Sequence, residues 1–181
     1  MLSPKCVRID DRDESSATAL QGEGWRFVER LLSMECRTFP VPKPDAIRYA
    51  TEFDLVRLVQ IARANMGPNR FIRDGLLDET FAADVREKWV REKLDHVLVY
   101  DDGNIRGFLL EGGEILELVV VDSIHRRRGV GRALTMAFIS QAWRNGHTFV
   151  RLGTQIDNEP AISMYRSLGF VTTGCRRTFH K

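Results

Sequence analysis

The sequence predicts an α/β fold whose central sheet is mixed but mostly antiparallel and is flanked by helices. First, an apolar run rich in β-branched residues, 118–121, leads through a glycine-bearing turn into a long segment of helical period, 129–145. Second, the junctions at 101–103 and 111–113 carry the aspartate and glycine of hairpin turns. Third, a strand-like segment at 148–152 returns after the helix, which indicates a parallel crossover.

Length and composition limit the classes of function. The 181 residues suffice for one good-sized domain, or for one domain with a small appendage. A net charge of +2, with no basic stripe interleaved with aromatic residues, argues against nucleic-acid binding. No apolar stretch approaches the length of a membrane span and no signal-peptide pattern is present, so we expect a cytoplasmic protein without a membrane partner. Three cysteines without paired ligand spacing predict no metal site.

Residues 1–44 are predicted to form a small N-terminal α/β extension, distinct from a main domain at 45–181. The prolines at 40, 42 and 44 remove backbone donors and restrict the preceding residues, which is typical of a linker. The extension is too small to bury a core of its own, so we expect it to pack on the main domain or on a second copy. Its expected elements are a strand at 5–9, a helix at 14–21 and a strand at 25–37.

The main domain is predicted to follow the order β-α-α-β-β-β-α-β-α-β-β. Thr51 is a plausible N-cap for its first helix, and the stretch from 69 to 78 shows no clear period. The remaining boundaries come from hydrophobic period and from turn residues. They are strands at 46–50, 96–100, 104–110, 114–121 and 148–152, helices at 52–64, 78–94, 129–145 and 159–168, and a closing hairpin at 170–174 and 176–179.

The turn between strand and helix has the sequence Arg126-Arg127-Arg128-Gly129-Val130-Gly131-Arg132. Glycines let several backbone N–H groups converge at the positive end of a helix, and the arginines add positive charge, so the turn suits a pyrophosphate. A Walker A loop would carry Lys-Ser or Lys-Thr where Arg132-Ala133 stands. The glycine spacing and the late position in the chain also exclude a dinucleotide-binding Rossmann fingerprint.

The Arg-x-x-Gly-x-Gly spacing resembles the coenzyme A signature of the GCN5-related N-acetyltransferase (GNAT) superfamily. A second segment, 158–170, resembles that superfamily's Asn-x-x-Ala-x-x-x-Tyr-x-x-x-Gly-Phe pattern. The resemblance covers residues 45–181. It implies the acyl-CoA N-acyltransferase fold and an enzyme that transfers acetyl from acetyl-CoA to an amine.

The resemblance also implies roles for individual residues. The backbone of the strand before the turn and the N-cap of the later helix would hold the pantetheine arm. Tyr165 would be the acid for the leaving thiolate, since a phenol of pKa about 10 is protonated at neutral pH; the alternative is a tyrosine that only packs at a helix face. The cofactor-binding residues would be Val119, Val121, Arg126, Arg127, Arg128, Gly129, Val130, Gly131, Arg132 and Asn158.

The general base is less well defined by the sequence. Glu114 begins the strand that leads into the turn, where related histone-modifying members carry a catalytic glutamate. Glu117 has the opposite parity and would face the other side of the sheet. Either residue can equally be a charge at a strand edge, and a water chain can replace both. His125 and His147 are expected to be surface residues beside turns.

We expect the acceptor to be a small-molecule amine. The stretches 69–71, 88–90, 94–96 and 153–155 resemble the TDP-fucosamine acetyltransferase branch, whose members acetylate a nucleotide-linked 4-amino-dideoxyhexose and carry a small N-terminal extension. By this resemblance the substrate residues are Asn69, Arg70, Phe71 and Arg73. The alternatives are an enzyme for a small free amine or a protein N-terminus, or a silent module that binds acetyl-CoA. A homodimer is also expected, through the extension or the last strands.

Overall fold

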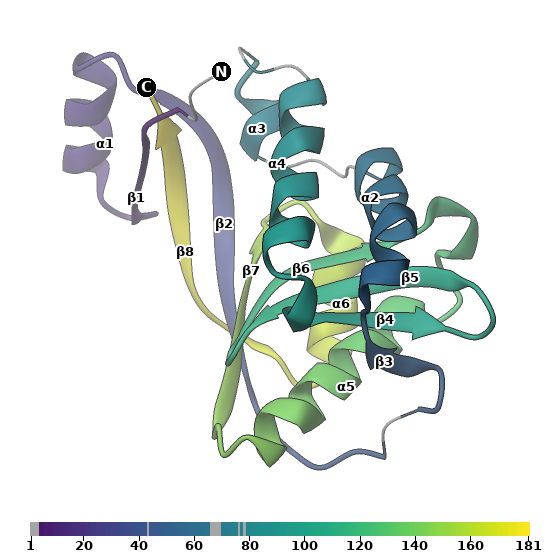
Figure 1. The fold of residues 1–181 in the computed structure, drawn as a ribbon. Coiled ribbons are helices and arrows are strands. Elements are labelled where there is room, and N and C mark those ends of the chain that lie inside the picture. Colours follow the sequence, from purple (N-terminus) through teal and green to yellow (C-terminus); the bar gives the residue numbers. More distant parts are fainter. Residues whose placement is uncertain (1–3, 43, 66–69, 76, 78) are drawn as a thin grey trace.

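The computed structural model describes residues 4–181 except 43, 66–69, 76 and 78. Its core is an eight-stranded sheet in the order β1-β8-β2-β7-β6-β5-β4-β3, as Figure 1 shows. The pairs are antiparallel except for β6 and β7, which are parallel, so the predicted mixed sheet is confirmed. The strands are β1 Cys6–Asp10, β2 Arg26–Arg37, β3 Ile47–Tyr49, β4 Val97–Asp101, β5 Ile105–Gly112, β6 Ile115–Val121, β7 Phe149–Gln155 and β8 Val171–His180.

Helices cover both faces of this sheet because its central strands alternate between two apolar cores. Leu109 of β5 packs with Phe138 and Ile162 from two helices on one face, α5 and α6. Its neighbours Phe108 and Leu110 pack with α2 and α4 on the other face. The helices are α1 Glu14–Gly22, α2 Leu55–Ala64, α3 Arg70–Arg73, α4 Glu79–Glu92, α5 Val130–Arg144 and α6 Glu159–Ser167, with 3-10 turns at Glu52–Asp54, Leu94–His96 and Ser123–His125.

The predicted N-cap of the first main-domain helix takes part in a charged cluster. The Thr51 backbone N–H donates to Asp54 Oδ2 at 2.7 Å, and Arg48 of β3 binds both oxygens of the same carboxylate at 2.7 and 2.9 Å. These bonds lower the pKa of Asp54 to about 2, and the hydrogen bonding from Arg48 has the largest effect. The cluster therefore fixes the start of this helix against β3.

The strands of the N-terminal segment lie inside the common sheet. β2 pairs with β7 on one side and with β8 on the other, and β1 pairs with the outer edge of β8 (Figure 1). Beyond β1, Lys5 and Lys181 exchange backbone hydrogen bonds of 3.1 Å, so the two ends of the described chain lie side by side. The division of the chain at residue 44 stays a prediction, but the strands on its two sides form one sheet.

The predicted closing hairpin is wrong. Residues 171–180 form the single strand β8, which pairs with β2 on one side and, from 176 to 180, with β1 on the other. Gly174 is not among the glycines with positive φ, and the chain continues extended through it. A register shift at Ser33/Met34 of β2 marks an irregularity in its pairing with β8. The interaction with strands far away in the sequence thus overrides a local turn signal.

Candidate functional site

The strand before the glycine turn separates from its parallel neighbour. In the described chain, β6 pairs with β5 from Ile115 to Val121 but with β7 only at Ile115↔Arg151 and Leu116↔Leu152. The Asp122 N–H donates to a β5 carbonyl, that of Arg106, at 2.9 Å. Because backbone groups alternate between the two edges of a strand, those of Val119 and Val121 point to the opened side. This leaves them free to hydrogen-bond an extended ligand, apart from the Val121 carbonyl, which accepts from the Arg126 side chain.

The glycine turn brings the start of α5 against this opening. Gly129 is the N-cap with φ of +82°, and no side chain among the described residues caps the helix. A methyl group added at Gly131 would lie 3.4 Å from the Met164 sulfur and 3.5 Å from Val121 Cγ2. These are ordinary contact distances, so a methyl group fits here, whereas a bulky side chain at this position would meet both β6 and α6. The uncapped N–H groups at the start of α5, together with the positive end of its helix dipole, can bind an anion.

The arginines of the turn differ in what they contact. Arg126 donates to the Val121 carbonyl at 3.3 Å and to Asn65 Oδ1 at 3.2 Å, while Arg132 donates to Ser167 of α6 at 2.7 Å. The remaining two, at 127 and 128, are exposed. Asn65 also accepts from the Ser123 N–H at 2.7 Å, and so organises the loop before the turn. Sequence reasoning missed this buried amide, whose signal was an asparagine at the end of α2.

α6 carries the predicted acid into the core behind the turn. Tyr165 is buried, its ring centroid lies 5.5 Å from that of Phe170, and burial raises the pKa of its phenol. The hydroxyl is therefore protonated at neutral pH, as the acid role requires. Asn158 stands at the N-cap of α6, but its side chain donates to Thr154 Oγ1 at 3.4 Å instead of capping the helix.

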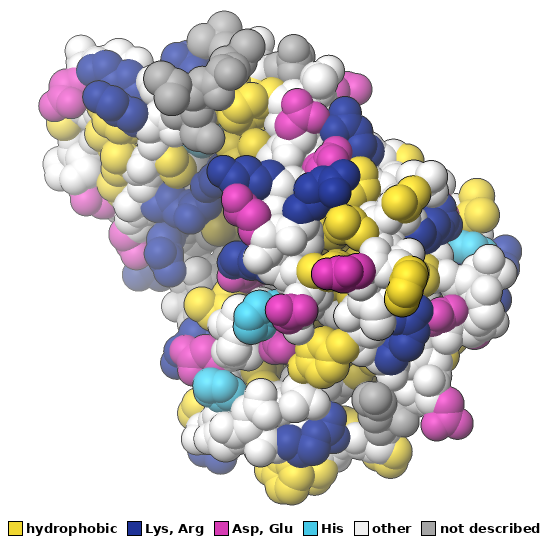
Figure 2. Space-filling view, viewed as in Figure 1, with side chains coloured by type: hydrophobic (Ala, Val, Ile, Leu, Met, Phe, Trp, Pro, Cys, Tyr) yellow, Lys and Arg dark blue, Asp and Glu magenta, His cyan; other side chains and the backbone are white. Residues whose placement is uncertain are grey.

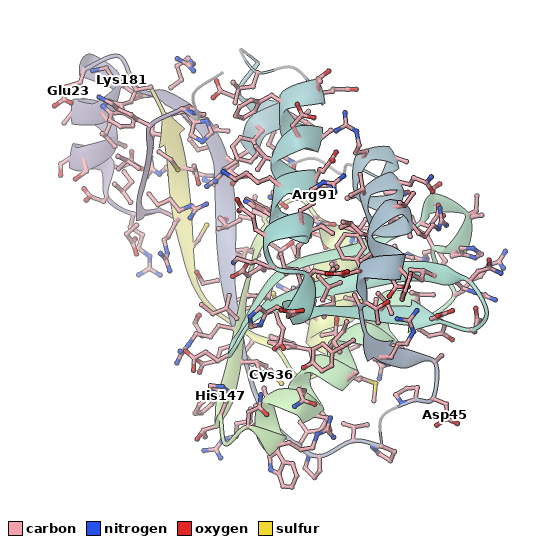
Figure 3. The ribbon with its side chains drawn as sticks, viewed as in Figure 1. Glu23, Cys36, Asp45, Arg91, His147 and Lys181 are labelled. Carbon is pink, nitrogen blue, oxygen red and sulfur yellow. The ribbon has the colours of Figure 1, made fainter. Side chains whose placement is uncertain are left out.

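The two glutamates considered as base both have cationic neighbours. Glu114 precedes β6 at the end away from the glycine turn, forms an ion pair with Arg151 and lies 3.8 Å from His147 Nδ1. His147 follows the C-terminal end of α5, as Figure 3 shows. Glu117 lies 2.6 Å from Lys93 Nζ. The role of Glu114 as base stays a prediction, and these contacts show a carboxylate already engaged.

The predicted acceptor residues lie on or beside α3. Asn69 lies outside the described residues. The Arg70 guanidinium stands 4.6 Å from the ring centroid of Phe71, which is buried and meets Phe81 edge-on at 5.6 Å. Arg73 donates twice to Asp157, each at 2.8 Å, and thus ties α3 to the loop before α6. Figure 2 shows Lys and Arg side chains on this face, where the β1–β8–β2 part meets α3 and α4.

A hollow of about 280 Å³ lies elsewhere, against the C-terminal half of α5. Tyr49, Leu98 and Arg144 are among its lining residues. The Tyr49 hydroxyl lies 3.1 Å from Glu111 Oε1, and burial, with this carboxylate, raises the pKa of Tyr49 to about 12. The hollow is at the opposite end of α5 from the glycine turn, so it is separate from the opened strands.

Within the described residues, no group of His, Cys, Asp or Glu side chains is arranged to hold a metal ion, and no helix there has the length and apolarity of a membrane span. An uncapped helix start behind a glycine turn, beside two parallel strands that part, defines the acyl-CoA-dependent N-acyltransferase class of fold. A family description, "Acetyltransferase (GNAT) family", matches residues 55–170. The chain belongs to this family, whose members in general use acetyl-CoA as cosubstrate.

Individual relatives extend the comparison. The chain is 29% identical over 172 residues to dTDP-fucosamine acetyltransferase of Escherichia coli O6:H1, covering 90% of this chain and 75% of that one. It is 27% identical over 107 residues to the [ribosomal protein bS18]-alanine N-acetyltransferase of E. coli K12, covering 57% and 69%. A solved GCN5-related N-acetyltransferase from Sphaerobacter thermophilus has TM-score 0.67 and 20% identity, with 99% of this chain and 60% of that one covered. The last likeness shows the fold.

Proposed function

We propose that the protein transfers an acetyl group directly from acetyl-CoA to the primary amine of a nucleotide-linked amino sugar. The opening between β6 and β7 beside the Gly129–Gly131 turn carries the acetyl-CoA part of this proposal. The acceptor part is supported by the relative named dTDP-fucosamine acetyltransferase, whose similarity extends over 90% of the chain. The similarity to the alanine N-acetyltransferase extends over 57%.

The residues of the opening divide the work of acetyl transfer. The pyrophosphate binds the N–H groups at the start of α5, with Arg127 and Arg128 adding charge from exposed positions. The backbone groups of Val119 and Val121 bind the pantetheine arm as a neighbouring strand would. A free N–H at this edge also stabilises negative charge that develops on the thioester oxygen.

The leaving thiolate needs a proton, and Tyr165 is the proposed donor. Its buried phenol keeps the proton at neutral pH and stands one residue from Met164, the side chain that packs at Gly131. Direct transfer is proposed because the turn and α6 contain no cysteine. Cys36 is buried on β2, and the other two cysteines lie on β1 and β8.

The proposal is tested by titrating the protein with acetyl-CoA in a calorimeter and then following thiol release with a panel of amines. The panel contains a TDP-linked 4-amino-dideoxyhexose, the same amino sugar without its nucleotide, a polyamine and a peptide with N-terminal alanine. Release that is fastest with the TDP-linked sugar supports the proposal. Binding without release on that sugar contradicts the acceptor, and absence of binding contradicts the whole proposal.

A protein N-terminus is the second candidate acceptor, because one relative is named for that activity. The discriminating observation comes from the same panel. An enzyme for a protein N-terminus would release thiol with the alanine peptide and not with the TDP-linked sugar. Binding of acetyl-CoA with no release on any amine would instead indicate a silent acetyl-CoA-binding module.

A further inference from the structure

A buried carboxylate on β2 has no role in the site as described so far. Glu29 is only 2% exposed, and its Oε2 accepts a hydrogen bond from Gln155 Nε2 at 3.2 Å. Within the described part of the chain, no lysine or arginine forms an ion pair with it. Burying a carboxylate without a cationic partner is costly, because one amide hydrogen bond replaces only part of its hydration. Such a group is well suited to receive a cation from outside the protein.

The position of Glu29 connects it to the opened strands. Gln155 is the last residue of β7, and its register partner on β2 is Leu31. The Leu31 side chain lies 3.0 Å from where a Cβ of Gly153 would be, and Gly153 directly follows the last residue of β7 that pairs with β6. Leu31 and Glu29 are two residues apart, so they share a face of the sheet about 7 Å from each other. Gly153, Leu31 and Glu29 thus form a line leading away from the point where β6 and β7 part.

The opposite charge comes from α3. Burial lowers the pKa of the Arg70 guanidinium most strongly and Arg8 adds to this, while Cys6 and Glu29 act in the other direction. Arg73, one turn further along, is held by Asp157 in the loop that follows Gln155. An acceptor with an ammonium at one end and a phosphate at the other would meet a carboxylate and a guanidinium in this arrangement.

We propose that Glu29 is a catalytic residue that binds the acceptor ammonium and takes its proton. This inference rests on the proposed amine acetylation. One N–H bond of the ammonium breaks as the proton passes to the Glu29 carboxylate. The nitrogen lone pair then forms the C–N bond to the acetyl carbonyl carbon while the C–S bond breaks. The thiolate takes up the Tyr165 proton, the phenolate recovers one from the acylated nitrogen, and Glu29 releases its proton to water.

Glu29 is a stronger candidate for the base than Glu114. Glu114 is ion-paired with Arg151 at the end of β6 away from the turn, whereas Glu29 has no such pair in the described structure. The inference also gives the N-terminal segment a chemical function. β2 lies between β7 and β8 and carries the carboxylate that completes the acceptor side. A glutamate in a strand with several other charged residues gives no signal of this in the sequence.

The test compares the full-length protein with Glu29→Gln and with the control Glu35→Gln. Glu35 lies on the same strand, is partly exposed and forms an ion pair with Arg151 at 2.8 Å, so its loss removes a charge without touching the line to the opening. Thiol release with the TDP-linked amino sugar is measured from pH 5 to 9, together with acetyl-CoA affinity. We expect Glu29→Gln to lower kcat/KM about 100-fold and to make the rate follow deprotonation of the free amine. Acetyl-CoA affinity stays unchanged.

The outcomes separate this inference from the proposed function. If the wild type acetylates the sugar and Glu29→Gln retains its rate and pH profile, Glu29 is not the base. If the wild type acetylates no amine, the proposed function is wrong, and this inference is wrong as well because it rests on it. Should Glu29→Gln fail to fold, the same rates and pH profile are measured for Glu29→Asp. We expect a lower rate with the pH profile of the wild type, because the carboxylate remains but is one methylene shorter; a rate equal to that of the wild type contradicts the proposal.

Discussion

The two ends of the proposed active site are built in different ways. The coenzyme end is made mainly of backbone groups: the edge of β6 at Val119 and Val121, the turn at Gly129 and the first N–H groups of α5. The acceptor end is made of side chains from separate parts of the chain, chiefly Glu29 and Arg70. A backbone site requires particular spacings of small residues within one short segment. A side-chain site requires only that distant segments meet.

This difference separates what is common to a family from what is particular to one member. The coenzyme end is proposed to bind a pyrophosphate and an amide-bearing arm that are the same for every acceptor, so one backbone arrangement would serve them all. The acceptor end must recognise an individual amine, and it can change through single side chains while the sheet remains intact. Substitutions at the two ends should therefore affect different constants.

The largest expected effect follows from filling the space at Gly131. Gly131→Trp places an indole where a methyl group would already approach Met164 and Val121, which blocks the start of α5. We expect acetyl-CoA binding to become undetectable by calorimetry, while Gly131→Ala, whose methyl needs only small adjustments, keeps measurable affinity. Wild-type affinity in Gly131→Trp would contradict the placement of the coenzyme. Thermal unfolding of both variants controls for loss of the fold.

A large effect on turnover alone is expected at Tyr165. Tyr165→Phe keeps the ring that packs near Phe170 and removes only the hydroxyl. We expect kcat to fall about 100-fold with acetyl-CoA affinity unchanged, because proton donation is needed only as the thiolate leaves. Steady-state kinetics together with calorimetry test this. An unchanged kcat would leave Tyr165 with a packing role only.

A smaller effect is expected at the acceptor end. Arg73→Gln breaks the pair with Asp157 that ties α3 to the loop before α6. We expect the acceptor KM to rise about tenfold, or about 1.4 kcal/mol, with little change in acetyl-CoA affinity. The exposed pair Arg63–Glu87 provides the control, since Arg63→Gln also removes an arginine but lies away from α3. Equal KM values for the two variants would show that Arg73 does not contribute to acceptor binding.

The smallest effect on activity is expected outside both ends, at the cluster of Arg48 and Asp54. Hydrogen bonds from Arg48 lower the pKa of Asp54 to about 2, against an ordinary value of 3.8. The unfolded chain thus takes up the proton first as the pH falls, so this stabilisation is complete above pH 3.8 and is lost toward pH 2. The shift corresponds to about 2 kcal/mol. Asp54→Asn should lose this amount in urea unfolding at pH 7 and less at pH 3, with acetyl-CoA affinity unchanged.

The sequence predicted the parts of the fold that depend on local signals. The turns around Gly103 and Gly113, both of positive φ in the structure, set the antiparallel meander, and the helical period after Gly129 set α5. The closing hairpin was predicted wrongly because residues 171–180 continue as one strand that pairs with β1 and β2, which are far away in the sequence. The pairing of β2 with β7 and β8 has no local signal, because any alternating strand can fill that position.

The same limit applies to the site. The turn and the segment around Tyr165 could be found because their spacing is itself the functional requirement. Asn65 and Glu29 could not, since each acts through a contact with a residue more than 50 positions away. Phe71 was predicted near the acceptor, and the structure places its ring in the interior beside Phe81. A hydrophobic residue in an irregular stretch does not reveal which side it faces.

The position of β2 also determines when this sheet can be completed. Both neighbours of β8 come from the first 37 residues, whereas β8 itself begins only at Val171. One edge of β2 therefore has no partner strand until the elements between β2 and β8 have been synthesised, and closure requires contacts between segments far apart in the sequence. Contacts of such long sequence range slow folding, so we expect β8 to dock late, after the meander of β4, β5 and β6 has formed.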